Sequence, residues 1–346
     1  MESSLNSRFS ISIALATYNG SIYISEQLDS IALQTRLPDE LVISDDASTD
    51  DTLDIVRDFA RRVSFPVRIY KNQERLGSTR NFEIAIRFCN GDIISLCDQD
   101  DIWYPNKLAL TEECFINNEK SGAVFTDADL VDEDLNPYKN GARVWEVLAL
   151  SLKQMRPFRR KWRLWEAIGF SELTASRDPY ALLLKHFTVT GTTMSFRSKF
   201  LDLLLPMPRG WIHDAWIGLM IGSVSGLSLI EEPTVAYRQH SSSQCGAPRY
   251  RKNIKGQTRA EKLELHAQLY NEAFLRLCEF SEKNKNIDID FQINCLKEKV
   301  KFLYERAALP NKRMRRLTTC LCCLVTLRYH RYGRGWKHFV RDLVIV

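Results

Sequence analysis

The sequence lacks the patterns that mark several common protein classes. No GxGxxG follows the first predicted strand and no GxxxxGK[ST] occurs anywhere, which excludes the usual dinucleotide-binding and P-loop proteins. No window reaches the roughly 18 apolar residues that span a bilayer, and the longest candidate, residues 317–327, is too short. Residues 1–8 carry no apolar stretch, so no signal peptide is expected. We therefore expect a cytoplasmic protein that is soluble or peripherally attached to a membrane.

The nine cysteines show no repeated CxxC spacing of the kind that binds structural zinc. An odd number of scattered cysteines is typical of reduced thiols in a cytosolic protein. Most of them are interpreted as small buried side chains.

The net charge of +5 is concentrated near one end of the sequence. Residues 311–346 contain nine Lys or Arg and one acid, with aromatic residues among them. A basic, aromatic-rich segment suits an anionic membrane surface, so peripheral membrane contact through this tail is one prediction. A solvated helix face is the alternative. No nucleic-acid partner is expected.

Strand and helix signals alternate regularly through the first 130 residues. Short apolar runs predict strands at 9–17, 40–44, 66–70, 92–97 and 122–125. Apolar residues at helical spacing predict helices between these strands, at 22–34, around 53–60, at 78–89 and at 106–117. This alternation indicates an α/β fold with a mostly parallel, Rossmann-like sheet flanked by helices.

The pattern becomes purely helical after residue 250. Leu263, Ala267, Tyr270 and Leu277 fall on one helical face, and further apolar residues repeat at the same spacing. We predict a catalytic domain over residues 1–248 and a helical, basic C-terminal extension over residues 249–346.

Polar residues collect where the predicted strands end. In an open α/β sheet, ligands bind outside the carboxyl ends of the strands. Four such ends here carry TYNG (17–20), DDASTD (45–50), NQERLG (72–77) and DQDD (98–101). The clustered carboxylates Asp98, Asp100 and Asp101 would repel one another, so they call for a divalent cation such as Mn²⁺ or Mg²⁺.

These segments resemble the donor-binding half of family 2 glycosyltransferases, which have the GT-A fold. The resemblance rests on TYNG, SDDASTDDT (44–52), RLGSTRNF (75–82) and CDQDDIWYPNKL (97–108). It continues through VTGTTMSF (189–196), WIHDAWIG (211–218) and YRQH (237–240), and so covers roughly residues 9 to 245 in order. It implies an enzyme that binds a nucleoside-diphosphate sugar.

The resemblance also implies residue roles. A pocket for the base and ribose would be lined by Thr17, Tyr18, Asn19, Asp45 and Asp46, completed by Arg80 or Asn81. Asp98 and Asp100 match the family's DxD motif, which holds ribose and metal-bound diphosphate, with Asp100 the better candidate for direct metal contact. Arg238 and His240 lie where a flexible segment commonly closes over the donor. His240 is placed to reach the diphosphate or the metal.

Asp214 lies where such enzymes keep their general base. An inverting transfer needs one carboxylate to remove the proton from the attacking acceptor hydroxyl. The alternative interpretations are a helix N-cap and an exposed surface charge. His213 beside it also suggests a metal-dependent phosphohydrolase pair, but the further His and Asp ligands of such a site are not evident among six histidines.

The sequence leaves the donor sugar open. The DQDD motif is similar to that of bacterial rhamnosyltransferases that use dTDP-L-rhamnose, and UDP-hexose and UDP-N-acetylhexosamine transferases share it. By analogy with the family, the acceptor would be a lipid-linked oligosaccharide of O-antigen or capsule synthesis. The rival classes are a non-catalytic sugar-nucleotide-binding protein and a nucleotidyltransferase, whose Gly-rich loop after the first strand is absent here.

Overall fold

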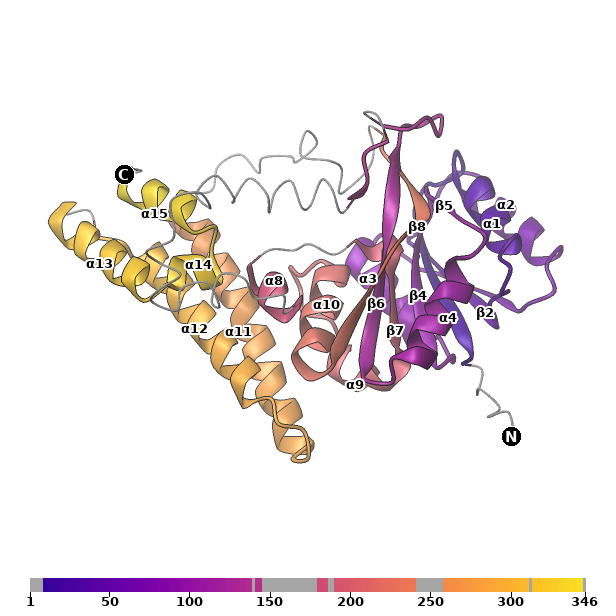
Figure 1. Cartoon of the computed structure of the whole chain (residues 1–346). Coiled ribbons are helices and arrows are strands. Elements are labelled where there is room, and N and C mark those ends of the chain that lie inside the picture. The colour runs from indigo at the N-terminus through magenta and orange to yellow at the C-terminus, as the bar shows by residue number, and fades with distance from the viewer. Residues whose placement is uncertain are drawn as a thin grey trace. The chain divides into compact units, whose positions relative to one another are not determined.

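The computed structural model describes residues 9–138, 141–144, 179–185, 190–240, 258–310 and 313–344 (Figure 1). The contacts between residues divide the chain into two compact units. The first holds the β-sheet with its helices, and the second holds a set of C-terminal helices together with α8 (Pro179–Lys185). The predicted boundary at residues 248 and 249 lies outside the described residues, so the domain limits stay a prediction.

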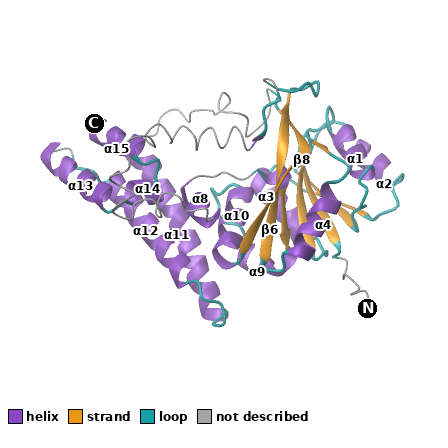
Figure 2. Cartoon of the chain, viewed as in Figure 1, coloured by secondary structure: helices purple, strands orange, loops and turns teal. Residues whose placement is uncertain are grey.

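The first unit is built on an eight-stranded sheet in the order β3-β2-β1-β4-β7-β6-β8-β5. Its strands are β1 (Ile11–Thr17), β2 (Glu40–Asp45), β3 (Val67–Lys71), β4 (Ile93–Asp98), β5 (Ile102–Trp103), β6 (Ser121–Val131), β7 (Met194–Arg197) and β8 (Gly226–Arg238). The pairs β2–β3, β1–β2, β1–β4 and β6–β8 are parallel, whereas β7 runs antiparallel to both β4 and β6. The predicted α/β sheet flanked by helices is confirmed (Figure 2).

The helices of this unit follow the strands, as the alternating pattern predicts. They are α1 (Ile24–Ala32), α2 (Thr52–Ala60), α3 (Ser78–Arg87), α4 (Lys107–Asn117), α9 (Leu201–Leu204) and α10 (His213–Val224). In α1 the buried residues Ile24, Leu28 and Ile31 recur every three or four positions, which turns one apolar stripe toward the sheet.

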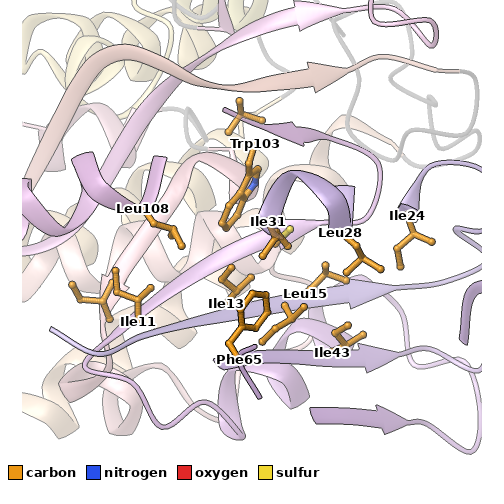
Figure 3. Close-up of a cluster of buried hydrophobic side chains, with 14 of the residues drawn as sticks. Ile11, Ile13, Leu15, Ile24, Leu28, Ile31, Ile43, Phe65, Trp103 and Leu108 are labelled. Atoms are coloured by element: carbon orange, nitrogen blue, oxygen red, sulfur yellow. The ribbon is translucent and has the colours of Figure 1, made fainter. Parts of the chain in front are cut away.

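The core of the sheet unit is a continuous apolar cluster (Figure 3). Alternate residues of β1, namely Ile11, Ile13 and Leu15, contribute to it and are fully buried. Because parallel strands covered on both faces are buried throughout, β1 and β2 are buried along nearly their whole length, polar residues such as Ser12 and Ser44 included, and do not alternate between buried and exposed positions. This burial fixes the positions of the strand ends that carry the polar motifs.

Three strands fall outside the sequence prediction. β5 and β7 are too short to give a periodic signal, and β8 is only half buried over most of its length. β6 also extends well beyond the predicted 122–125, so Asp127 and Asp129 lie in a strand that pairs with β8. These segments become strands by pairing with partners more than ninety residues away in the sequence, and the local sequence pattern does not predict such pairing.

The second unit is helical, as predicted for the C-terminal extension. Besides α8 it contains α11 (Arg259–Lys283), α12 (Asp290–Ala307), α13 (Arg313–Val325), α14 (Arg328–Tyr332) and α15 (Trp336–Val344). Thr258 opens α11 with a capping box, in which its hydroxyl accepts the N–H of Glu261 and the Glu261 carboxylate accepts the N–H of Thr258. No helix among the described residues is long and apolar enough to cross a membrane.

A buried ion pair ties the C-terminal helices together. Asp342 of α15 is fully buried and accepts hydrogen bonds from Arg306 Nε at 2.6 Å and from the Tyr329 hydroxyl at 2.8 Å, with Arg259 as a second ion-pair partner. Burial by itself raises the pKa of Asp342, but the hydrogen bonds and charges of Arg306 and Arg259 outweigh it and hold the pKa below its usual value. The carboxylate therefore links α15 to α11, α12 and α14.

We expect Asp342→Asn to destabilise the helical unit by about 3–5 kcal/mol, because it leaves the Arg306 guanidinium buried without its counter-charge. Hydrogen exchange should accelerate in α11 to α15 and not in the sheet. For the wild type, the depressed pKa means that this stabilisation is present above the pKa of an unfolded aspartate and is lost as the pH falls through the folded value.

Glu279→Gln provides the control, because Glu279 pairs with Lys283 on the exposed side of α11. This variant should exchange like the wild type. Equal exchange in the Asp342→Asn variant and the wild type would contradict a structural role for the buried pair.

Candidate active site

The parallel register places the predicted donor-site residues at one edge of the sheet. Thr17 at the end of β1 lies opposite Asp45 at the end of β2, and Ala16 lies opposite Asp98 at the end of β4. The Thr17 hydroxyl donates to Asp45 Oδ2 at 3.0 Å. The strand order, with β1 between β2 and β4, therefore brings together motifs that are up to eighty residues apart.

The turn after β1 is braced from the DxD loop. The Gln99 side chain accepts the Tyr18 N–H at 2.8 Å and donates back to the Tyr18 carbonyl at 3.2 Å. A Cβ at Gly20 would lie 2.3 Å from Gln99 Oε1, so a side chain there would displace the Gln99 amide from Tyr18. The Arg75 guanidinium lies over the Tyr18 ring, 4.1 Å from its centroid. Asn19 is exposed at the tip of the turn, with its amide oxygen accepting the Thr49 N–H.

The two carboxylates of Asp45 and Asp46 are buried and hold backbone. Asp45 Oδ1 accepts the Ser48 N–H at 2.9 Å, which closes the turn after β2. Asp46 accepts the N–H groups of Leu76 and Gly77 at 2.7 and 2.8 Å. The carboxylates therefore fix the loops that would surround a nucleoside, and their direct contact with a base stays a prediction.

Arg80 and Asn81 of α3 differ in accessibility. The Asn81 amide is buried and donates to the Thr17 carbonyl at 3.0 Å, so it braces the end of β1. The Arg80 guanidinium pairs with Glu83 and remains about one-third exposed, with a side-chain exposure of 35%. Of the two, Arg80 is the side chain that a ligand can reach without displacing a buried bond.

Carboxylates crowd the end of β4. Burial, and then the negative charges of Asp100 and Asp214, raise the pKa of Asp98 to about 8. The charge of Asp214 acts on Asp98 although the two residues lie 116 positions apart in the chain. The structure thus brings the predicted general base and the predicted DxD motif to the same end of the sheet.

Asp100 and His240 converge as a metal-binding pair would. Asp100 Oδ2 lies 2.8 Å from His240 Nε2, and the imidazole ring packs against Tyr23 with 4.8 Å between ring centroids. No group of three His, Cys, Asp or Glu side chains in the described parts of the chain forms a complete ligand set. A carboxylate, an imidazole and the concentrated negative charge nevertheless fit a divalent cation that takes its remaining ligands from substrate oxygens.

Asp214 lies in the first turn of α10, where the helix N-terminus favours a negative charge. Burial raises the pKa of Asp214 to about 6, against the opposing effect of hydrogen bonds from the backbone N–H groups of Ala215 and Gly191. The Thr79 hydroxyl donates to the Trp211 carbonyl at 2.9 Å and so links α3 to the segment that leads into α10. A carboxylate with this pKa is ionised at neutral pH and still basic enough to accept a proton.

His213 belongs to no metal-binding cluster in the described part of the chain. Its ring stacks on Phe82 at 3.9 Å between centroids and lies against Gly191, where a Cβ would be 2.8 Å from Nε2. Burial lowers the pKa of His213 to about 3, so the ring is neutral. His213 therefore supports the Gly191 turn by packing, and the phosphohydrolase alternative finds no support in its surroundings.

Arg238 is buried and holds neighbouring segments together, and it does not lie on an exposed loop. Its Nε donates to the Asp100 carbonyl at 2.8 Å, one terminal nitrogen donates to the Glu133 carbonyl at 2.6 Å, and the other pairs with Glu26. The guanidinium also lies 4.6 Å from the centroid of the Tyr23 ring. With every guanidinium nitrogen engaged and 3% exposure, Arg238 ties the end of β8 to the DxD loop two residues before His240.

Two residues of this network were not predicted from the sequence. Tyr23 and Glu26 at the start of α1 contact Arg238 or His240. Asp101, one of the clustered carboxylates of the DQDD motif, is buried and accepts the Arg238 N–H at 3.0 Å. Tyr23 and Glu26 lie within six residues of TYNG, so proximity to a motif is the signal that could have found them. The flexible segment expected around Arg238 and His240 continues past residue 240, outside the described residues.

Comparison with known proteins identifies the family of the chain. The family model for glycosyl transferase family 2 matches residues 12–198, more than half of the chain. The chain belongs to that family. It is 29% identical over 242 residues to the dTDP-rhamnosyl transferase RfbG of Shigella flexneri, covering 67% of this chain and 74% of RfbG. It is 31% identical over 147 residues to the abequosyltransferase RfbV of Salmonella typhimurium, covering 40% and 43% of the two chains.

A solved structure shares the fold. That of S. aureus TarS 1-349 in complex with UDP-GlcNAc matches with a TM-score of 0.52 and 16% identity, covering 96% of this chain and 90% of that one. The GT-A assignment is thereby confirmed, and the protein is a glycosyltransferase of family 2. The crowded edge of the sheet is the part of this fold where its chemistry is expected.

We expect Arg238→Lys to weaken Mn²⁺ binding by about 10–100-fold, the usual cost of losing a residue that orients metal ligands. A lysine cannot reach Asp100, Glu133 and Glu26 at once, so His240 and the DxD loop lose their common support. Binding would be followed as Mn²⁺-induced thermal stabilisation.

Arg36→Lys is the matched control, because Arg36 is equally buried and binds the Phe9 carbonyl and Glu112 on other elements. It should lower stability and leave the Mn²⁺ response unchanged. If both variants respond to Mn²⁺ like the wild type, Arg238 does not position the metal ligands.

Proposed function

We propose that this protein is an inverting, metal-dependent glycosyltransferase of cell-surface polysaccharide synthesis. It moves a sugar from a nucleoside-diphosphate donor to a hydroxyl of a lipid-linked oligosaccharide, and L-rhamnose from dTDP-rhamnose is the favoured donor. The single observation that carries the proposal is the location of Asp214 within electrostatic reach of Asp98, at the edge where Asp100 meets His240. A base for the acceptor and a site for the diphosphate are therefore neighbours.

Each residue has a defined task in the proposed reaction. The Asp214 carboxylate takes the proton of the acceptor hydroxyl as that oxygen forms a bond to the anomeric carbon. The bond from the anomeric carbon to the diphosphate oxygen breaks in the same step, and the nucleoside diphosphate leaves with the electron pair. Thr17, Tyr18, Asn19, Asp45, Asp46 and Arg80 bind or shape the nucleoside pocket, and Asn81 braces it.

Asp98, Asp100 and His240 would hold the cation. Bound there, Mn²⁺ or Mg²⁺ neutralises the growing negative charge of the departing diphosphate, so no protein acid is required. The imidazole favours Mn²⁺, because Mg²⁺ is usually held by oxygen ligands alone. The Asp100–His240 hydrogen bond uses the same two atoms that would ligate the cation, so metal binding would replace that bond.

The similarity to RfbG and RfbV supports the donor class of the proposal, whereas the acceptor class rests on analogy with the family. Both names describe transferases of deoxy sugars, which favours rhamnose or a related deoxyhexose over a UDP-hexose or UDP-N-acetylhexosamine. A lipid-linked acceptor requires the enzyme to work at a membrane surface, and peripheral attachment to the inner face of the cytoplasmic membrane follows from this. A non-catalytic sugar-nucleotide-binding role is the second candidate, and the intact Asp214 and DxD motif disfavour it.

Donor hydrolysis tests the proposed activity. Purified protein is incubated with a panel of dTDP- and UDP-sugars in Mn²⁺, Mg²⁺ or EDTA, beside Asp100→Ala. We expect release of one nucleoside diphosphate that requires metal and is lost in the variant. The same panel is read by thermal shift, because a donor that binds the folded state raises the melting temperature even without turnover. If no sugar nucleotide is turned over or stabilises the protein with metal present, the proposed function is wrong.

The pKa of Asp214 predicts the pH profile. Since the base acts as a carboxylate, kcat/KM should rise with pH and reach a plateau above a value of about 6. Asp214→Asn should lower kcat by about 10²–10⁴-fold and leave donor-induced stabilisation intact. Asp202→Asn, which changes an exposed carboxylate of α9, is the control and should keep the wild-type profile. A profile that is flat between pH 5 and pH 7, in about the range where His and raised carboxyl groups titrate, would assign the base elsewhere.

A further inference from the structure

The C-terminal helices α13 and α15 each present an apolar stripe to solvent. On α15 the stripe consists of Trp336, Val340 and Val344, spaced four residues apart, with exposures of 43%, 53% and 71%. On α13 it consists of Met314, Leu321 and Val325. Isolated exposed apolar residues are ordinary, but two stripes on neighbouring helices need an explanation.

Both stripes lie away from the packed faces of their helices. Phe339 and Asp342 of α15 and Cys320 and Cys323 of α13 are buried among the C-terminal helices. At about 100° of turn per residue, the α13 stripe lies opposite Cys320 and Cys323. The exposed stripes are therefore surplus to the packing of the unit, because the core that holds α13 to α15 is already formed by other side chains.

The exposed charges carried by α13 to α15 have one sign. Lys337 and Arg341 form the row next to the apolar stripe of α15, and both are exposed. Arg315 beside the α13 stripe, and Arg331 and Arg334 between the helices, are exposed as well. The only acid from residue 313 to residue 344 is Asp342, which is buried and neutralised by Arg306 and Arg259.

Helix α11 of the same unit shows that this arrangement is specific. It exposes the apolar residues Leu265 and Leu275, but charges of both signs lie beside them, with Glu261, Lys262 and Glu264 near Leu265 and Glu272, Arg276 and Glu279 near Leu275. A surface of mixed charge is typical of ordinary contact with water. On α13 to α15, no exposed carboxylate repels an anionic surface.

We propose that the exposed stripes of α13 and α15, with their basic neighbours, form a docking surface for an anionic lipid bilayer. Apolar side chains with a Trp among them insert at the level of the headgroups, and Lys and Arg pair with lipid phosphates. The inference rests on the proposed function, because a lipid-linked acceptor is presented at a bilayer. It names the surface that keeps the enzyme there.

Co-sedimentation of the full chain with vesicles tests the surface. We expect binding to vesicles of phosphatidylglycerol and phosphatidylethanolamine at low salt, and weak binding to pure phosphatidylcholine. Lys337→Gln/Arg341→Gln should lower the partition coefficient by about 30-fold, on the basis of about 1 kcal/mol for each basic residue at an anionic surface. In high salt the charges are screened, and the binding that remains is expected to come from the apolar side chains. Trp336→Ala/Val340→Ser/Val344→Ser should abolish this remaining binding.

Matched controls come from α11 and the segment that follows it. Lys262→Gln/Lys285→Gln removes the same charge, and Leu265→Ser/Leu275→Ser removes comparable exposed apolar area, from the mixed-charge surface. Both should bind vesicles like the wild type. The Lys337→Gln/Arg341→Gln variant changes only exposed side chains, so it keeps the test decisive even if the apolar variant fails to fold.

Two outcomes would overturn the proposal. One is that the wild type does not bind anionic vesicles at low salt. The other is that the α15 variants bind like the wild type, including the case in which they dissociate an oligomer seen by ultracentrifugation, which would make the surface an interface between copies. Asp214→Asn should bind vesicles like the wild type although it loses transfer. If the wild type binds anionic vesicles but transfers no sugar, the proposed function fails and this proposal stands. If it transfers sugar but does not bind vesicles, this proposal fails and the proposed function stands.

Discussion

Repulsion among carboxylates is the constraint on which the organisation of the site depends. The charges of Asp100 and Asp214 both act on Asp98 at the end of β4, and Asp101 is fully buried beside Asp98 and Asp100. Such a cluster persists in a folded protein only where positive charge, backbone N–H groups or protonation offset the repulsion. The N-terminus of α10, the Arg238 N–H and the His240 imidazole supply part of this compensation, and a divalent cation would complete it.

Arg238 connects this compensation to the fold. Its guanidinium joins the end of β8, the DxD loop, the start of α1 and the Glu133 turn, so several segments share one buried cation. The residue therefore acts on the site through the segments it holds. The acidic edge is stable as an arrangement because the strands beneath it are buried on both faces and leave no freedom to separate.

The two units differ in the charge that they place at their surfaces. The sheet unit carries the carboxylates at the ends of its strands, whereas the helical unit keeps its only acid from residue 313 onward inside, at Asp342, and exposes Arg315, Arg331, Arg334, Lys337 and Arg341. One buried aspartate thus serves both the cohesion of the helices and the uniform sign of the surface outside them. The clustered carboxylates and the exposed basic residues thus belong to different units.

The sequence by itself predicted the class of fold, which is confirmed, and the edge of the sheet at which chemistry is expected, because buried strands are mainly apolar and polar motifs follow their ends. It also identified Asp98, Asp100, Asp214 and His240 as a set, through motifs that resemble a known family. Only the tertiary structure decided which polar groups are free. Asp46, Asn81 and Arg238 look like ligand-binding residues in sequence, yet each is buried and bonded to backbone of another segment. The tertiary structure also decided that β7 and β8 are strands and that one apolar stripe of α15 faces solvent. Their pairing or exposure is set by partners far away in the chain, and local pattern contains no information about such partners.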